Sequence, residues 1–204
     1  MKLHPFLQSH TLISDQVSPQ EVSIILGELE ALLGRGARGS VVEFGCYTGT
    51  TSLFIRRILD AFAYDGPFHV YDSFAGLPGK SLHDQSAAGE QFLPGELAAT
   101  KKQLMQHFHK ARLRPPIAHK AWFDQLNPGD VPDEIMFAFL DGDYYESIRH
   151  SLRLITPKLM KGATIIVDDY ANEALPGAGR AVDEWCRGRR VNLRVEASLA
   201  IIRT

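Results

Sequence analysis

Two short acidic stretches contain residue types that could do chemistry. Residues 139–147 read F-L-D-G-D-Y-Y-E-S, and residues 166–170 read I-V-D-D-Y. In both stretches the aspartates directly follow an apolar run, which is typical of the end of a buried strand. Ligands of open α/β sheets bind beyond the carboxyl ends of the strands, so we expect Asp141, Asp168 and Asp169 to lie close together.

Three carboxylates in one small volume repel one another, which raises their pKa values unless a cation neutralises them. Oxygen ligands suit magnesium or another hard divalent ion. Asp141, Asp168 and Asp169 are therefore candidate metal ligands. The alternative is that these aspartates only cap the helix that follows each strand.

The rest of the chain alternates helical and strand-like patterns, as an α/β fold requires. A helix is predicted over Ser18 to Leu33, where apolar residues recur at helical spacing and Ser18 forms a capping box with Glu21. Apolar runs predict parallel strands at 40–44, 68–71, 135–140 and 163–167, with crossover helices at 50–62, 96–111 and 145–159. Runs at 193–195 and 199–202 predict a closing hairpin. A mostly parallel sheet with a reversed final strand is expected.

The composition is that of an ordinary globular domain, with 45% hydrophobic residues, 23% charged residues and a formal net charge of -2. Its interspersed charges argue against a nucleic-acid partner, since phosphate binding normally needs a basic face. We expect no membrane partner. Two cysteines are too few for a disulfide framework and no signal-peptide pattern is present, so a cytoplasmic location is expected.

A single domain over residues 1–204 is predicted, because no internal repeat or low-complexity linker divides the chain. It begins with a helical segment, 1–35. Residues 79–98 are rich in small and polar types, and they could form an inserted lid over a site or a passive surface loop.

The turn after the first predicted strand reads E-F-G-C-Y-T-G-T-T. Gly45 and Gly49 could let the backbone approach a ligand, but Tyr47 replaces the middle glycine of a dinucleotide fingerprint. Glu43 adds a negative charge that would repel a pyrophosphate and attract a cationic ligand such as S-adenosylmethionine. Asp72, after the second strand, could accept hydrogen bonds from both ribose hydroxyls. A nucleoside cofactor is favoured, although the glycines could form only a tight corner and Asp72 could cap a turn.

Several motifs together resemble the class I S-adenosylmethionine-dependent methyltransferases, and within them the macrocin O-methyltransferase-like sugar O-methyltransferases. The resemblance covers roughly residues 17–183. It depends on six stretches in the family's order, namely V-E-F-G-C-Y-T-G-T-T-S, V-Y-D-S-F-A-G-L-P, A-W-F-D-Q-L-N-P, F-L-D-G-D-Y-Y-E-S, L-M-K-G-A-T-I-I-V-D-D-Y and G-A-G-R-A-V-D-E-W. The fold it implies is a three-layer αβα Rossmann-like domain with a seven-stranded, mostly parallel sheet and a reversed last strand.

The resemblance also assigns roles to residues. Asp141, Asp168 and Asp169 would hold magnesium, Asp143 would be the general base, and Asp141 would share in catalysis. Ala121 and Trp122 would lie near the adenine of the cofactor. The implied cofactor-binding residues are Glu43, Gly45, Tyr47, Thr48, Gly49, Thr50, Asp72, Ser73, Ala121, Trp122 and Asp141.

The implied function is metal-assisted methyl transfer from S-adenosylmethionine to a hydroxyl of a small molecule, such as a sugar of a glycosylated natural product. A homo-oligomer is compatible with it. A catechol-type O-methyltransferase acting on an aromatic diol commonly has lysine three places after the first aspartate, where Tyr144 stands. A non-catalytic nucleoside-binding module also remains open. A nicotinamide-dependent oxidoreductase would require the middle glycine of the dinucleotide fingerprint, which is missing here. The family's members extend further before the first confident helix, which leaves the acceptor pocket and the oligomeric state open.

Histidine and cysteine offer weaker candidates. His107 and His109 are expected to be solvated surface residues, because they lie on a polar-rich predicted helix. His83, in segment 79–98, and His119, at a predicted third strand, could contact substrate. Cys46 is expected to be a buried small hydrophobe.

Overall fold

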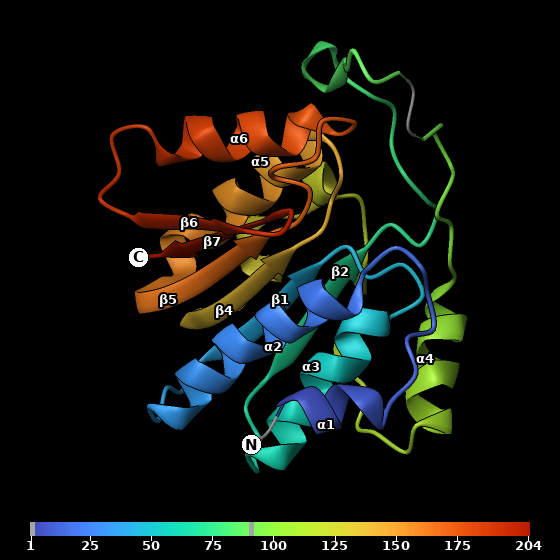
Figure 1. Ribbon diagram of the computed structural model, residues 1–204, viewed down its shortest axis with the longest axis vertical. Coiled ribbons are helices and arrows are strands. Elements are labelled where there is room, and N and C mark those ends of the chain that lie inside the picture. Colours follow the sequence, from blue (N-terminus) through green and yellow to red (C-terminus); the bar gives the residue numbers. More distant parts are fainter. Residues whose placement is uncertain (1–2, 90–91) are drawn as a thin grey trace.

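The computed structural model describes residues 3–89 and 92–204, and it is built on one seven-stranded sheet (Figure 1). The strand order is β3-β2-β1-β4-β5-β7-β6. β7 runs antiparallel to both of its neighbours, β5 and β6, whereas the other pairs are parallel. The predicted fold class is therefore confirmed. The strands are β1 (Ser40–Phe44), β2 (Phe68–Asp72), β3 (Ile117–Lys120), β4 (Ile135–Leu140), β5 (Leu159–Val167), β6 (Asn192–Glu196) and β7 (Leu199–Arg203).

Helices cover both faces of the sheet and so give three layers (Figure 1). Leu26, Phe54 and Phe108 belong to the core between the sheet and α2, α3 and α4, and Ile148 and Val182 to the core beneath α5 and α6. The helices are α1 (Leu3–Gln8), α2 (Pro19–Gly34), α3 (Thr50–Ala61), α4 (Lys101–Lys110), α5 (Tyr145–Ile155) and α6 (Pro176–Cys186).

Local sequence explains most element boundaries. The predicted capping box begins α2: the backbone N–H of Glu21 donates to Ser18 Oγ, and the backbone N–H of Ser18 donates to the Glu21 carboxylate. A second capping box, between Thr100 and Gln103, starts α4 at Lys101, five residues later than predicted. Pro157 lies in a 3-10 turn (η4, Thr156–Lys158) that ends α5, so β5 begins earlier than expected.

In its described parts, 79–89 and 92–98, segment 79–98 contains one short 3-10 helix, η1 (Leu82–Asp84), which lies near the start of α6 at the top of Figure 1. The base of the segment is closed by backbone hydrogen bonds, from Leu77 N to Glu96 O at 2.9 Å and from Gly95 N to Leu77 O at 2.9 Å. The segment is therefore a loop that returns to its starting point and leaves the sheet uninterrupted.

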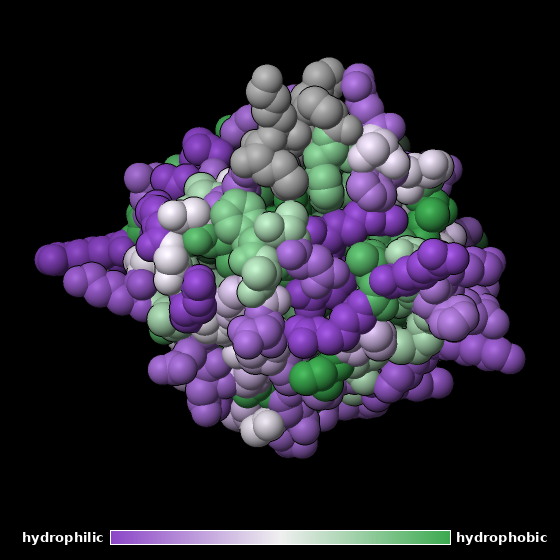
Figure 2. All heavy atoms as spheres, turned by 90° about the horizontal axis from the view of Figure 1, so that it is seen from below, coloured by the Kyte–Doolittle hydropathy of each residue, from purple (hydrophilic) through white to green (hydrophobic). Residues whose placement is uncertain are grey.

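The surface gives little sign of a broad apolar face on the side seen in Figure 2. Hydrophilic residues predominate there, and apolar residues form separate patches among them. In the described residues, no helix combines the length and the apolar character needed to cross a bilayer.

Gly45 allows the turn after β1 to touch the end of β4, so its replacement should destabilise the fold. A Cβ atom at Gly45 would lie 1.7 Å from the backbone oxygen of Asp141, and its φ of +86° is left-handed. We expect Gly45→Ala to lower the free energy of unfolding by about 3 kcal/mol or more in urea denaturation. The control is Gly36→Ala, which has a φ of +77° but no atom within 4 Å of the added carbon, and should cost only about 1 kcal/mol. Equal losses for both variants would contradict the proposed clash.

Candidate active site

The carboxyl ends of the central strands frame a pocket of about 330 Å³. Its walls come from the turns after β1, β2, β3, β4 and β5, from the turn between β6 and β7, from positions 76–78, 92 and 97, and from residues just before and at the start of α2. The predicted site residues that line it are Gly45, Tyr47, Asp72, Ser73, Trp122, Asp141, Asp143, Asp168 and Asp169. The structure thus brings both acidic stretches to the same pocket as the glycine turn.

Five residues of the predicted cofactor set are not among the lining residues: Glu43, Thr48, Gly49, Thr50 and Ala121. Glu43 is fully buried beneath the turn, where Ser52 Oγ donates to its Oε2 at 2.5 Å. The second carboxylate oxygen of Glu43 is buried without a hydrogen-bond partner among the described residues, as are the hydroxyls of Thr48 and Thr50. Cofactor contact by these residues stays a prediction.

Burial changes the charge that Glu43 presents. Loss of hydration raises the pKa of Glu43 to about 8, an effect that the Ser52 hydrogen bond opposes and the nearby Asp72 charge reinforces. The carboxyl is therefore mostly protonated at pH 7. The negative charge that was expected to attract a cationic cofactor is not displayed in this form of the protein.

Asp72 holds the glycine turn in place. Its Oδ2 accepts hydrogen bonds from the backbone N–H groups of Cys46 at 2.8 Å and Tyr47 at 3.2 Å, and its Oδ1 accepts from Phe74 N at 2.7 Å. The alternative reading of Asp72 as a turn cap is therefore observed. Because the residue also lines the pocket, a further hydrogen bond from a ribose hydroxyl stays a prediction.

In the strand-end turns that line the pocket, three non-glycine residues have left-handed backbones: Tyr47 (φ 45°), Asp143 (φ 57°) and Asp169 (φ 57°). Such conformations are uncommon and persist where the surroundings enforce them. Each directs a side chain of the strand-end turns in a way that a regular turn would not. They occur in the stretches that the sequence marked as chemically interesting.

Burial and neighbouring carboxylates raise the pKa values of the four aspartates. For Asp141 and Asp168, burial is the main cause and neighbouring carboxylates add to it, so both pKa values lie well above the usual range. Burial, together with the charges of Asp169 and Asp72, raises the pKa of Asp143 to about 7. The pKa of Asp169 is raised as well, mainly by burial. Ionising all four aspartates at once is therefore unfavourable in free energy.

The four carboxylates are suitable ligands for a hard cation, but their present geometry does not form a coordination site. Within the described ranges, no three His, Cys, Asp or Glu side chains form a group able to hold a metal ion as they stand. Asp168 Oδ1 accepts from Asp169 N at 2.8 Å and from Ser198 Oγ at 3.2 Å, and Asp169 Oδ1 accepts from Asn172 Nδ2 at 2.8 Å. A bound cation would relieve the mutual repulsion, and it would have to draw these side chains together.

Sequence reasoning missed the part of the pocket wall that lies near the start of α2. Asp15 and Gln16 reach it from the chain before α2, where no periodic pattern signals a role. Glu21 lines the pocket as well as capping α2, because its Oε1 accepts from Ser198 Oγ at 2.6 Å. Leu77 and Pro78 complete the wall together with Phe92 and Leu97, which belong to segment 79–98, the stretch predicted to be a lid or a passive surface loop.

The positions of the histidines differ in part from those predicted from the sequence. His107 is half-buried, not solvated, and its Nδ1 lies 2.8 Å from the backbone oxygen of Thr48 in the glycine turn. His119 does lie in β3, where its ring stacks on Tyr71 at 4.4 Å, but it does not line the pocket. His83 packs against Tyr145 at a ring distance of 4.1 Å.

Solved structures place this fold among the methyltransferases. The O-methyltransferase NovP superposes with a TM-score of 0.78 at 24% identity, over 92% of this chain and 80% of that one. The calicheamicin methyltransferase CalS11 gives a TM-score of 0.74 at 19% identity, over 99% of this chain and 90% of the other. At these identities the likeness defines the fold, a Rossmann-like class I methyltransferase fold.

Sequence comparison defines the family. The model of the macrocin-O-methyltransferase (TylF) family matches residues 20–198, and the chain belongs to that family. It is 32% identical over 153 residues to the 8-demethyl-8-(2,3-dimethoxy-alpha-L-rhamnosyl)-tetracenomycin-C 4'-O-methyltransferase of Streptomyces olivaceus, covering 72% of this chain. It is 29% identical over 165 residues to the demethyldecarbamoylnovobiocin O-methyltransferase of Streptomyces niveus, covering 77% of this chain. These matches span 58% and 62% of the two relatives' lengths.

Glu43 should make stability fall as pH rises, because its pKa of about 8 in the fold exceeds the usual value of 4.5. The folded state holds this proton where the unfolded state has released it, so the contribution is fully present below about pH 4.5 and lost by about pH 8. We expect Glu43→Gln to remove a slope of up to about 1.4 kcal/mol per pH unit from urea unfolding between pH 5 and 8. Glu173→Gln, at an exposed position, is the control and should keep the wild-type slope. An unchanged slope in Glu43→Gln would refute the assignment.

Proposed function

We propose that the chain is an S-adenosylmethionine-dependent O-methyltransferase that methylates a sugar hydroxyl of a glycosylated natural product. The observation that carries the proposal is the joining of the glycine turn, Asp72 and four aspartates in one pocket, in a chain of the macrocin-O-methyltransferase family. The names of its relatives support the acceptor class, because they specify O-methylation of a rhamnosyl tetracenomycin and of demethyldecarbamoylnovobiocin.

The cofactor side of the pocket is the glycine turn with Asp72, Ser73 and Trp122. Gly45 and its neighbours bring backbone close to the ligand, and Asp72 offers the ribose an acceptor. The indole of Trp122 provides an aromatic surface for the adenine. S-adenosylmethionine supplies the electrophilic methyl group on its sulfonium when bound.

Asp143 is the general base of the proposed reaction. Its pKa of about 7 is near the operating pH, where a base combines an available carboxylate with a useful affinity for the proton. Asp143 takes the proton of the acceptor hydroxyl while the hydroxyl oxygen bonds to the methyl carbon, and the electrons of the broken carbon–sulfur bond return to sulfur. Leu77, Phe92 and Leu97 shield the reaction from water.

Magnesium is the proposed ion for Asp141, Asp168 and Asp169. Buried carboxylates with raised pKa values are a donor set that a hard cation stabilises. A bound ion would act as a Lewis acid that lowers the pKa of a coordinated hydroxyl. Asp143 remains available for the proton.

The charge of the pocket supports an uncharged acceptor. Among the described lining residues there is no Lys, Arg or His, whereas the acidic ones are Asp15, Glu21, Asp72, Asp141, Asp143, Asp168 and Asp169. Even with magnesium bound to the aspartate cluster, Asp15, Glu21 and Asp72 would repel the two phosphate charges of a nucleoside-diphosphate sugar. A neutral glycoside meets no such penalty, even though one structural neighbour is named as a TDP-rhamnose 3'-O-methyltransferase.

Binding and acceptor preference test the proposed function together. We expect S-adenosylmethionine to bind with a dissociation constant of about 100 μM or lower in isothermal titration, about -5.5 kcal/mol or more favourable. In product analysis by mass spectrometry, a panel of neutral rhamnosides should be methylated and TDP-rhamnose should not. Absence of cofactor binding would sink the proposal, whereas methylation of TDP-rhamnose alone would overturn only the acceptor class.

Two variants should distinguish the role of the metal ligands from that of the general base. Asp168→Asn should weaken magnesium binding at least about tenfold in titration calorimetry, since it removes a charged ligand. Asp143→Asn should keep magnesium and cofactor binding but lower kcat by about 10²-fold or more, because it removes the proton acceptor. Full activity after removal of divalent ions with EDTA would rule out the metal assignment and leave the role of Asp143 intact.

A further inference from the structure

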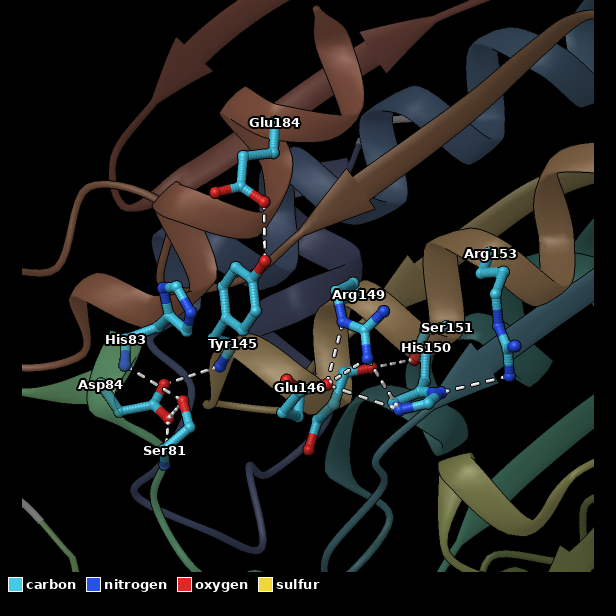
Figure 3. A network of polar contacts seen from close by, with 11 residues as sticks. Ser81, His83, Asp84, Tyr145, Glu146, Arg149, His150, Ser151, Arg153 and Glu184 are labelled. Carbon is cyan, nitrogen blue, oxygen red and sulfur yellow. Dashed lines mark hydrogen bonds and ion pairs between the residues drawn. The ribbon is translucent and has the colours of Figure 1, made fainter.

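Segment 79–98 is fixed to the body of the protein by the buried carboxylate of Asp84 (Figure 3). Asp84 ends η1 and is 3% exposed, whereas the adjacent turn residue Leu82 is 79% exposed. Asp84 Oδ1 accepts from Tyr145 N at 2.7 Å. Its Oδ2 accepts from both the backbone N–H and the hydroxyl of Ser81, each at 2.7 Å. Both carboxylate oxygens are therefore engaged where the segment meets α5.

The hydrogen bond to Tyr145 completes the start of α5. The first N–H groups of a helix have no partner within it, and the N-cap residue of α5, Tyr144, provides no side-chain cap. Asp84 supplies the missing acceptor from 61 positions earlier in the chain. Its negative charge is favourable at this end of the helix.

The first turn of α6 closes the other side of the same junction. A Cβ atom at Gly177 would lie 1.8 Å from Asp84 Oδ1 and 2.7 Å from Tyr145 N, so a side chain there would collide with the hydrogen bond. Figure 3 shows the ring of His83 beside that of Tyr145, whose hydroxyl donates to Glu184 Oε2 at 2.6 Å. η1, α5 and α6 thus meet around one carboxylate.

This junction directly follows the loop that presents Asp143. Asp143 has a left-handed φ of 57°, and Tyr144 N donates to Gly142 O at 2.6 Å. The hydroxyl of Tyr144 donates to the backbone oxygen of Phe92, a lining residue of the pocket, at 3.3 Å. Segment 79–98 and the loop 141–145 are therefore joined at two points, one through Tyr145 N and one through Phe92.

We propose that Asp84 is a positioning residue, which makes docking of segment 79–98 and ordering of the loop 141–145 a single event. When the segment is docked, Phe92 closes the pocket wall and the backbone around Asp143 is held. When it is undocked, the pocket wall opens and the start of α5 loses its acceptor. Only the catalytic consequence rests on the proposed function, whereas the coupling does not.

Hydrogen–deuterium exchange of the full chain tests the coupling without an acceptor. In Asp84→Asn, which keeps the side-chain volume, we expect exchange to accelerate about tenfold in the peptides covering both 77–97 and 141–149, because one docked unit opens together. Tyr145→Phe is the control, since it loses the Glu184 hydrogen bond but keeps the backbone donor and the ring, and both regions should stay close to wild type.

Two exchange results would overturn the proposal: faster exchange at 141–149 alone, which describes a helix cap and nothing more, or no change in either region. With an acceptor that the wild type methylates, Asp84→Asn should lower kcat about tenfold, while the KM for S-adenosylmethionine and the circular dichroism spectrum stay unchanged. An unchanged kcat would also overturn it. If the wild type failed to bind S-adenosylmethionine, the proposed function would fail and the exchange result would still decide the coupling.

Discussion

The crowding of four carboxyl groups at one edge of the sheet is the constraint on which the rest of the site depends. Asp141 N donates to Phe44 O at 2.8 Å and Asp168 N to Leu140 O at 2.9 Å, so the ladders of three neighbouring strands continue into the acidic turns. The backbone therefore leaves these side chains little freedom to move apart. Their repulsion can be relieved by protons or by a cation, and the raised pKa values record the first of these outcomes.

The strands that lead into the acidic edge are deeply buried. Every residue of β1 and β4 is buried, and so is the second half of β5. Local opening of such strands costs close to the full stability of the domain, whereas exposed connections open readily. The acidic edge is thus built on rigid supports, and mobility is left to the segments that surround it.

The contrast between buried strands and exposed connections also explains which elements could be predicted from the sequence. β4 is an uninterrupted apolar run and β1 is apolar except for Ser40 and Glu43, and both boundaries of each strand were predicted correctly. β3, at the edge of the sheet, has no buried residue, and only its position near His119 was anticipated. α1 has no strong apolar period, and α4 begins late because an unrecognised capping box at Thr100 overrides the helical propensity before it.

For the site, the acidic stretches predicted the aspartate cluster because strand ends share an edge whatever the loops do. The state of Glu43 was not predictable from its position two residues before Gly45, because its charge depends on burial in the finished fold. Asp15 and Asp84 show the other limit. Asp15 has no periodic or motif signal, and the Ser81–Asp84 capping box is a local motif that does not indicate the contact of Asp84 with the distant Tyr145 N.

The predictable and the unpredictable site residues lie in different parts of the pocket. One half, the proposed cofactor side, is made by turns that directly extend the strands, where sequence position determines spatial position. The rest of the wall comes from lining residues at positions 15, 16 and 21 and at 76–78, 92 and 97. A few long-range hydrogen bonds fix these segments, such as those from Ser198 to Glu21 and from Tyr145 N to Asp84. Such a wall can change its residues without disturbing the sheet, because no strand pairing depends on it. A family with one sheet edge can therefore present differently shaped walls to different acceptors.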